Sequence, residues 1–108
     1  MLTKIEQEQV RNVLTEARAL VARGWCKENL WIDTVTGERS YCALGAIRSV
    51  AMGLLHSNTL FHNAADQFFQ HLQKSYNNNI SSIINWNDLS ETTQEIVLAA
   101  FDEYLASN

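Results

Sequence analysis

The chain contains no proline, few glycines and few cysteines, and each shortage limits the turns, helix breaks or disulfides that the fold can contain. With no proline and only four glycines among 108 residues, no helix is broken by proline, and turns must rely on Gly, Asn, Asp and Ser. The two cysteines, Cys26 and Cys42, are too few for a disulfide-stapled scaffold. We therefore expect free thiols in a reducing cytosol, and the sequence leaves a single Cys26–Cys42 bridge open.

Long apolar stretches are absent as well. No segment approaches the ~20 apolar residues that a membrane-spanning helix needs, and the polar, acidic start of the chain lacks the apolar core of a signal peptide. Hydrophobic residues make up 46% and charged residues 19% of the sequence, which is an ordinary globular mix. We therefore expect one soluble, cytoplasmic domain over residues 1–108, with no membrane partner.

Positive charge is scarce in the second half of the chain. Residues 1–54 hold seven of the eight Lys and Arg against six acidic residues, whereas residues 55–108 hold only Lys74 against six, a net charge of −5. General nucleic-acid binding is not expected, because it requires a basic surface that displaces counterions. A local cationic site in the first half and an acidic surface that faces a basic partner protein both stay open.

Hydrophobic periodicity predicts a mainly helical fold of about four helices. Apolar residues recur at the three- and four-residue spacing of amphipathic helices in the segments 4–23, 43–55, 59–76 and 93–105. Residues 30–42, between the first two, read as one short β-hairpin whose turn uses Gly37 for its positive φ. We expect residues 80–84 to form at most one helical turn, and residues 85–88 an irregular turn.

Short signatures predict where helices begin and end. Thr3 with Glu6, and Thr92 with Glu95, fit the S/T-x-x-E capping box at a helix N-terminus. Gly24 directly follows the first helix, where a glycine commonly takes the left-handed conformation.

Cys42 is the candidate for covalent chemistry. It stands at the expected N-terminus of the 43–55 helix, where the helix dipole lowers the pKa of a thiol. A nucleophilic cysteine would also need a base, for which the chain offers His56, His62 and His71. The spacing of the cysteines and histidines fits no metal-ligand pattern, so we expect no metal site.

The favoured interpretation of Cys42 is structural. No signature of a thiol enzyme surrounds it, and free cysteines are commonly buried as small hydrophobic residues. Under this interpretation Cys42 and Gly45 are small because the segments around Trp25 and Trp86 pack over the start of the second helix.

Arginines and tryptophans suggest a second kind of site. If they converge, they form a cationic pocket with an aromatic floor, which suits phosphate or a nucleotide. The candidate ligand-binding residues are Arg18, Arg23, Trp25, Trp31, Arg39, Arg48, Trp86 and Asp88. Alternatively, the arginines are solvated surface charges and the tryptophans pack the hairpin against the helices.

A recognisable pattern covers nearly the whole chain, from Ala17-Arg18-Ala19-Leu20 to Phe101-Asp102, and three short blocks are its most specific part. They are Gly24-Trp25-Cys26, Cys42-Ala43-Leu44-Gly45-Ala46 and Trp86-Asn87-Asp88. The pattern resembles an uncharacterised family of small bacterial and phage proteins, known only as a domain of unknown function. This chain differs in its Asn-rich segment before Trp86 and in lacking the proline that often follows the third block. The resemblance implies that the three blocks form one structural unit, and it implies no activity or cofactor.

Three functions are compatible with these features. The first is a small non-enzymatic binding or inhibitor protein, encoded by a phage or mobile element and acting on a host protein such as a defence protein. The second is sequestration of a nucleotide-like anion by the arginines and tryptophans, and the third is a cysteine enzyme that uses Cys42. We expect the first, and hence neither catalysis nor a cofactor, while a homodimer stays open. Pull-down, a nucleotide thermal-shift panel and the iodoacetamide reactivity of Cys42 separate the three.

Overall fold

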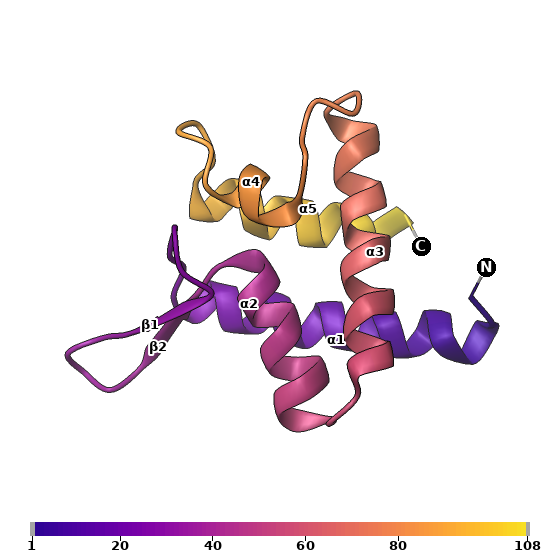
Figure 1. Cartoon of the computed structure of the whole chain (residues 1–108), viewed down its shortest axis with the longest axis horizontal. Helices are drawn as coiled ribbons and strands as arrows, with labels where there is room; N and C mark the ends of the chain where they lie inside the picture. Colours follow the sequence, from indigo (N-terminus) through magenta and orange to yellow (C-terminus); the bar gives the residue numbers. More distant parts are fainter. Residues whose placement is uncertain (1, 108) are drawn as a thin grey trace.

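The computed structural model describes residues 2–107, and within that range it is mainly helical with one short hairpin (Figure 1). The elements are α1 (Lys4–Arg23), β1 (Trp31–Asp33), β2 (Arg39–Tyr41), α2 (Ala43–Arg48), η1 (Ser49–Leu54), α3 (Asn58–Ser75), α4 (Ile83–Asn87) and α5 (Gln94–Ser107). The expected fold class, a helical domain with a hairpin between its first two long helices, is confirmed. None of the helices described in residues 2–107 is long and apolar enough to cross a membrane.

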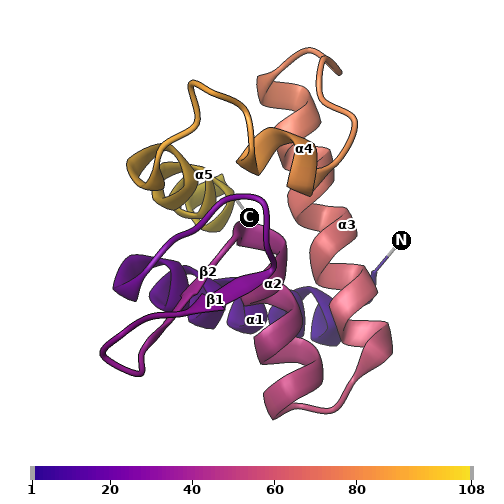
Figure 2. The ribbon, with the colours of Figure 1, turned by 60° about the vertical axis from the view of Figure 1, so that its left-hand side comes forward.

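The helices share one hydrophobic core that is built around α1. Five apolar residues of α1 are fully buried, and α2, α3 and α5 all pack against this helix (Figures 1 and 2). An aromatic cluster closes the core on the other side: Phe68 of α3 stacks on Phe101 of α5 at 4.4 Å between ring centroids, and its edge meets Trp86 of α4 at 5.9 Å. Burial of these large rings contributes strongly to stability. Aromatic packing therefore joins α3, α4 and α5 on this side of the core.

The second helical segment changes its winding partway along. Residues 43–55, expected as one helix, form α2 followed without a break by η1, a π-helical segment with wider turns. The chain then reverses at His56, which adopts the left-handed conformation with φ of 50°, and Ser57 caps α3 through a hydrogen bond from the Leu60 amide at 3.1 Å.

The β1–β2 hairpin is antiparallel and projects from the helical body (Figures 1 and 2). Trp31 lies opposite Tyr41, Ile32 opposite Ser40 and Asp33 opposite Arg39, and Gly37 supplies a positive φ of 87° in the turn, as expected. A third segment covers the outer edge of β2.

This segment, residues 24–26, pairs with β2 as a short parallel bridge. The Tyr41 amide donates to the Gly24 carbonyl at 2.9 Å, and the Cys26 amide donates to the Tyr41 carbonyl at 3.2 Å. The covered edge of β2 therefore belongs to the helical body, and the hairpin is attached to the body along that edge.

The expected left-handed conformation of Gly24 is wrong. Its φ of 177° is extended backbone, which any residue adopts. Glycine is instead suited to this position by a close approach, because a Cβ there would lie 2.7 Å from Oγ of Ser40.

Two expectations in the second half of the chain also fail. Residues 85–87, expected in an irregular turn, are helical as the end of α4. Thr92 does not cap α5: its hydroxyl donates to the Trp86 carbonyl at 2.7 Å, and Thr93 Oγ1 accepts from the Ile96 amide at 3.3 Å instead. Either Thr92 or Thr93 could have capped α5 from its place in the sequence. The hydrogen bond from Thr92 to the Trp86 carbonyl leaves Thr93 as the cap.

Replacing Gly45 with alanine is expected to lower the free energy of unfolding by about 3 kcal/mol, because overpacked backbone has no room to shift. An added Cβ would overlap the Leu30 carbonyl oxygen and lie 2.6 Å from its carbon. Gly53 is the control, since the nearest atom to its added Cβ, Oγ of Ser49, is 4.0 Å away. Gly53→Ala should be neutral or stabilise by about 0.5 kcal/mol. Urea unfolding measures both, and equal losses would contradict the close approach.

Candidate functional site

The three sequence blocks meet at the side chain of Asn87, which is fully buried. Its Oδ1 accepts hydrogen bonds from Trp25 Nε1 at 2.9 Å and from the Ala43 amide at 3.0 Å. Its Nδ2 donates to the Cys26 carbonyl at 3.1 Å. One amide thus joins the end of α4, the N-terminus of α2 and the segment that follows α1, so the blocks form one structural unit.

Asp88, the next residue, holds the turn that follows Cys26. Its Oδ1 accepts from the Glu28 amide at 3.0 Å and from Asn87 Nδ2 at 3.0 Å. Glu28 has a φ of 69°, a left-handed conformation that costs a non-glycine residue free energy. The carboxylate offsets this cost by satisfying the strained residue's own amide.

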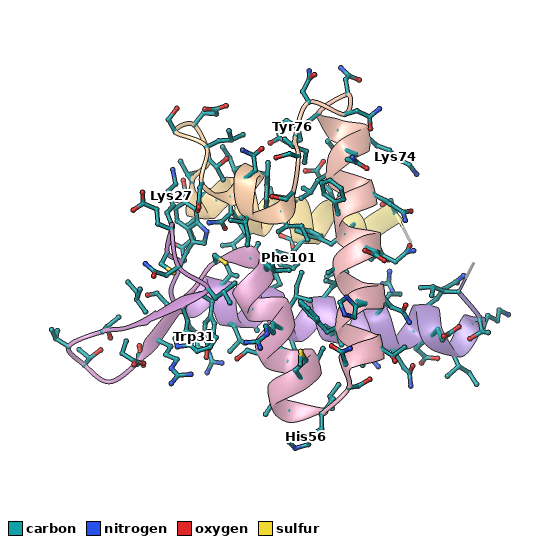
Figure 3. All side chains as sticks on the ribbon, in the orientation of Figure 1. Lys27, Trp31, His56, Lys74, Tyr76 and Phe101 are labelled. Atoms are coloured by element: carbon teal, nitrogen blue, oxygen red, sulfur yellow. The ribbon has the colours of Figure 1, made fainter. Side chains whose placement is uncertain are left out.

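Lys27 supports the same turn from the outside. Its ammonium donates to the Leu89 carbonyl at 2.7 Å and lies 5.5 Å from the ring centroid of Trp25, within the range of a cation–π contact. Figure 3 shows Lys27 beside the loop that carries it. Lys27 and Trp25 therefore both contact the segments that Asn87 joins.

Cys42 is the N-cap of α2, as its sequence position suggested, but it is not activated. Sγ accepts from the Gly45 amide at 3.3 Å, and only 3% of the residue is exposed. Burial raises the pKa of the Cys42 thiol despite that hydrogen bond, and burial raises the pKa of the Cys26 thiol in the same way. A protonated, buried thiol is a poor nucleophile.

The candidate bases lie elsewhere. His71 meets the ring of Tyr104 edge-on at 5.8 Å, and His62 lies against Phe61 at 5.3 Å. His56 is exposed at the far end of η1, where Figure 3 shows it pointing away from the body. In residues 2–107 no group of three His, Cys, Asp or Glu side chains could hold a metal ion.

A small cavity of about 130 Å³ adjoins the junction. It is lined by Glu28, Asn29, Leu30, Cys42, Ile84 and Asp88. Such a volume is well below the ~300 Å³ at which ligand pockets begin. The cavity therefore offers room for a small side chain or solvent rather than for a nucleotide.

The structure does not bring the arginines and tryptophans into one pocket. Arg18 points to α5, where it forms a bidentate ion pair with Asp102 at 3.0 and 3.1 Å. Trp86 is fully buried in the core and cannot stack on a ligand there. Arg48 lies half-buried at the end of α2.

Arg23 and Arg39 come together in a shallow cavity of about 180 Å³ that also contains Leu20, Glu38 and Tyr41. Arg39 is already occupied: it pairs with Asp33 at 2.9 Å and its guanidinium lies 5.2 Å from the ring centroid of Trp31. Arg23 has no ion-pair partner among residues 2–107. The cluster thus offers one unpaired cation beside one acidic residue.

The model of a family of unknown function, DUF6197, matches residues 6–106. The chain belongs to this family. The matched range contains all three blocks, so the resemblance to an uncharacterised domain is confirmed, and the DUF6197 blocks are the residues that the Asn87 amide joins. No curated protein and no solved structure matches the chain significantly.

Sequence reasoning missed the central role of Asn87 in this DUF6197 chain. An Asn beside an Asp favours a turn, so the sequence predicted only a local turn at Asn87 and not its hydrogen bonds to distant segments. The available signal was the position of Asn87 directly after Trp86, because a large aromatic residue is normally well buried and brings its neighbour close to the core.

The Asn87→Ala variant should lose about 3 to 4 kcal/mol of unfolding free energy, because it strands the Trp25 indole N–H, the Ala43 amide and the Cys26 carbonyl in the interior. Asn85 is the matched control on the same helix. It is exposed and accepts only a 3.3 Å hydrogen bond from the Ser81 amide, so Asn85→Ala should cost less than about 1 kcal/mol. Similar losses in urea unfolding of the two variants would count against the proposed role.

The raised thiol pKa values of Cys26 and Cys42 make stability depend on pH. Well below the ordinary thiol pKa of about 8.5, both thiols are protonated in the folded and unfolded chains, so they do not change stability with pH. Above it the unfolded chain releases protons that the folded chain retains, and the free energy of unfolding falls as pH rises. Urea unfolding between about pH 8 and pH 9.5 should show this fall, and Cys42→Ala should reduce its slope. An unchanged slope would contradict a raised pKa at Cys42.

Proposed function

We propose that this DUF6197 protein is a non-enzymatic binding protein that engages another protein through its β1–β2 hairpin. The observation that carries the proposal is the open edge of β1 on a projecting hairpin. The specific case that we favour is an inhibitor encoded by a phage or mobile element and acting on a host protein.

The open edge follows from the hydrogen bonds of Tyr41. Its amide and carbonyl are both used by residues 24–26 on the far side of β2. Tyr41 thus points its backbone amide and carbonyl away from β1. In an antiparallel ladder the residue directly opposite then points its own amide and carbonyl away from β2. Trp31 is that residue, and Asp33 follows two positions later on the same edge. Their amides and carbonyls are therefore available to an added strand.

Apolar side chains beside this edge add to the available surface. All three residues of β1 are exposed, including Ile32 at 42%, and Val35 at the turn is fully exposed. Trp31 lies below the hairpin in the view of Figure 3, with Arg39 over its ring. Aromatic residues and arginine are enriched at protein–protein interfaces.

The shape of the hairpin favours a concave partner. Because the hairpin projects (Figure 2), a groove can contact its edge and both faces at once. Two hairpins from two copies of this chain would pair over only the three residues of β1. Such a short contact would bury far less than the ~1,000 Å² of surface expected of a stable interface. A different protein therefore fits the surface better than a homodimer.

The other two functions have weaker support. Arg18 and Arg39, two of the four candidate arginines, are engaged in ion pairs, which weakens the case for a nucleotide-like anion. The buried, protonated thiol of Cys42 disfavours a cysteine enzyme.

Site-specific photo-crosslinking tests the proposed function. A benzoylphenylalanine at Val35, in the hairpin turn, should give a discrete adduct with one partner protein in cells. The same probe at exposed Gln70 on α3 should not. Adducts from Gln70 but not from Val35 would place the binding surface elsewhere.

The isolated partner then allows a matched pair of variants. Ile32→Lys on β1 should weaken binding at least about tenfold, the effect of losing an interface contact worth about 1.4 kcal/mol. Ile84→Lys, at a position exposed to nearly the same extent (44% against 42%) on α4, should bind like the parent. Equal affinities of the two variants would contradict the role of the hairpin.

A further inference from the structure

The two cysteines occupy neighbouring positions of the parallel bridge at the base of the hairpin. Trp25 is paired with Tyr41, so the next residues, Cys26 and Cys42, stand side by side in the same register. Adjacent strands lie about 4.8 Å apart, and paired residues point their side chains to the same face. This backbone separation falls within the Cα–Cα range of about 4.4–6.8 Å that disulfides span.

The contacts of the two thiols agree with this placement. Sγ of Cys26 lies 3.5 Å from the carbonyl oxygen of Ser40, two residues before Cys42. Cys42 Sγ lies at the N-terminus of α2, which directly continues the bridged segment. Both thiols are free, and the pKa of Cys26 is raised partly by the nearness of Cys42, after the larger effect of burial.

We propose that Cys26 and Cys42 are an oxidative modification site, at which a low-molecular-weight disulfide such as glutathione disulfide converts the two thiols into an intramolecular disulfide. This inference does not depend on the proposed function of the hairpin, because it rests on the register of the bridge alone.

The chemistry takes two thiol–disulfide exchanges. The thiolate of Cys26, the more exposed of the two at 7% against 3%, attacks one sulfur of glutathione disulfide and releases one glutathione thiolate. The Cys42 thiolate then attacks the Cys26 sulfur of this mixed disulfide and releases the second glutathione. The two protein thiols are oxidised, one glutathione disulfide is reduced to two glutathiones, and the two thiol protons pass to the released thiolates.

The product would close a covalent ring around the whole hairpin. Residues 26 and 42 bracket β1, the turn and β2, and the Asn87 amide already holds the backbone at Cys26 and Ala43. Because the native fold pre-aligns the two residues, it should favour the disulfide, and the disulfide should in turn stabilise the native fold.

The test compares disulfide formation in the folded and unfolded chain. The full-length protein is equilibrated with mixtures of glutathione and glutathione disulfide at pH 8, without urea and in unfolding urea, starting from reduced and from oxidised protein. Acid quenching, intact mass and peptide mapping give the ratio of disulfide to dithiol in each state. Cys26→Ser and Cys42→Ser are controls that can form only glutathione adducts.

We expect the folded chain to favour the Cys26–Cys42 disulfide about 100-fold more than the unfolded chain, as for a well-aligned native bridge. A ratio of one or less, which includes an oxidised form that cannot fold, would overturn the proposal. So would a folded protein whose end product is a glutathione adduct on either cysteine. The samples that start reduced and those that start oxidised must reach the same ratio of disulfide to dithiol. Slow access of glutathione disulfide to the buried thiols would leave the two ratios different, so it cannot be mistaken for either result.

Discussion

The buried amide of Asn87 makes four hydrogen bonds, to Trp25, Cys26, Ala43 and Asp88. An amide removed from water is costly unless its donors and acceptors are satisfied, and here the carbonyl oxygen accepts twice and the amino group donates twice. The cost of burial is thereby offset, and the bonds reach segments that are distant in the sequence. Hydrophobic packing cannot specify such a junction, because it is non-directional, whereas these bonds fix which backbone atoms meet.

The position of the hairpin depends on this junction. β1 packs mainly on β2, and two strands alone are marginally stable in water. The hairpin is held because residues 24–26 cover the edge of β2, and Asn87 holds those residues against α2. Close contacts complete the arrangement, since Gly45 lets the Leu30 backbone pass over α2. The same fixed base leaves the opposite edge of β1 and its apolar side chains directed toward solvent, where a partner can reach them.

The sequence predicted the parts of this structure that rest on local patterns. The long helices and the hairpin follow from periodicity and turn chemistry, and their bounds differ from expectation by only one or two residues except around α4. The failures have tertiary causes. The Thr92 hydroxyl donates to the Trp86 carbonyl instead of capping α5. Gly24 is suited to its position by the close approach of Ser40, and Arg18 forms an ion pair with Asp102 on α5. No spacing rule reveals such partners, so the proposed arginine–tryptophan pocket, which required convergence, was the least predictable element.

Hydrogen exchange of the tryptophan indole protons, followed by NMR, tests the central role of Asn87 most directly. Trp25 Nε1–H donates to Asn87, whereas Trp31 stands on the exposed strand and serves as an internal reference. If the junction is as stable as the core, the Trp25 indole proton should exchange as slowly as the core amides of α1, because both then exchange only through global unfolding. The Trp31 indole proton should exchange rapidly. A Trp25 indole proton that exchanges as fast as that of Trp31 would contradict the account, because the Asn87 junction would then open independently of the fold.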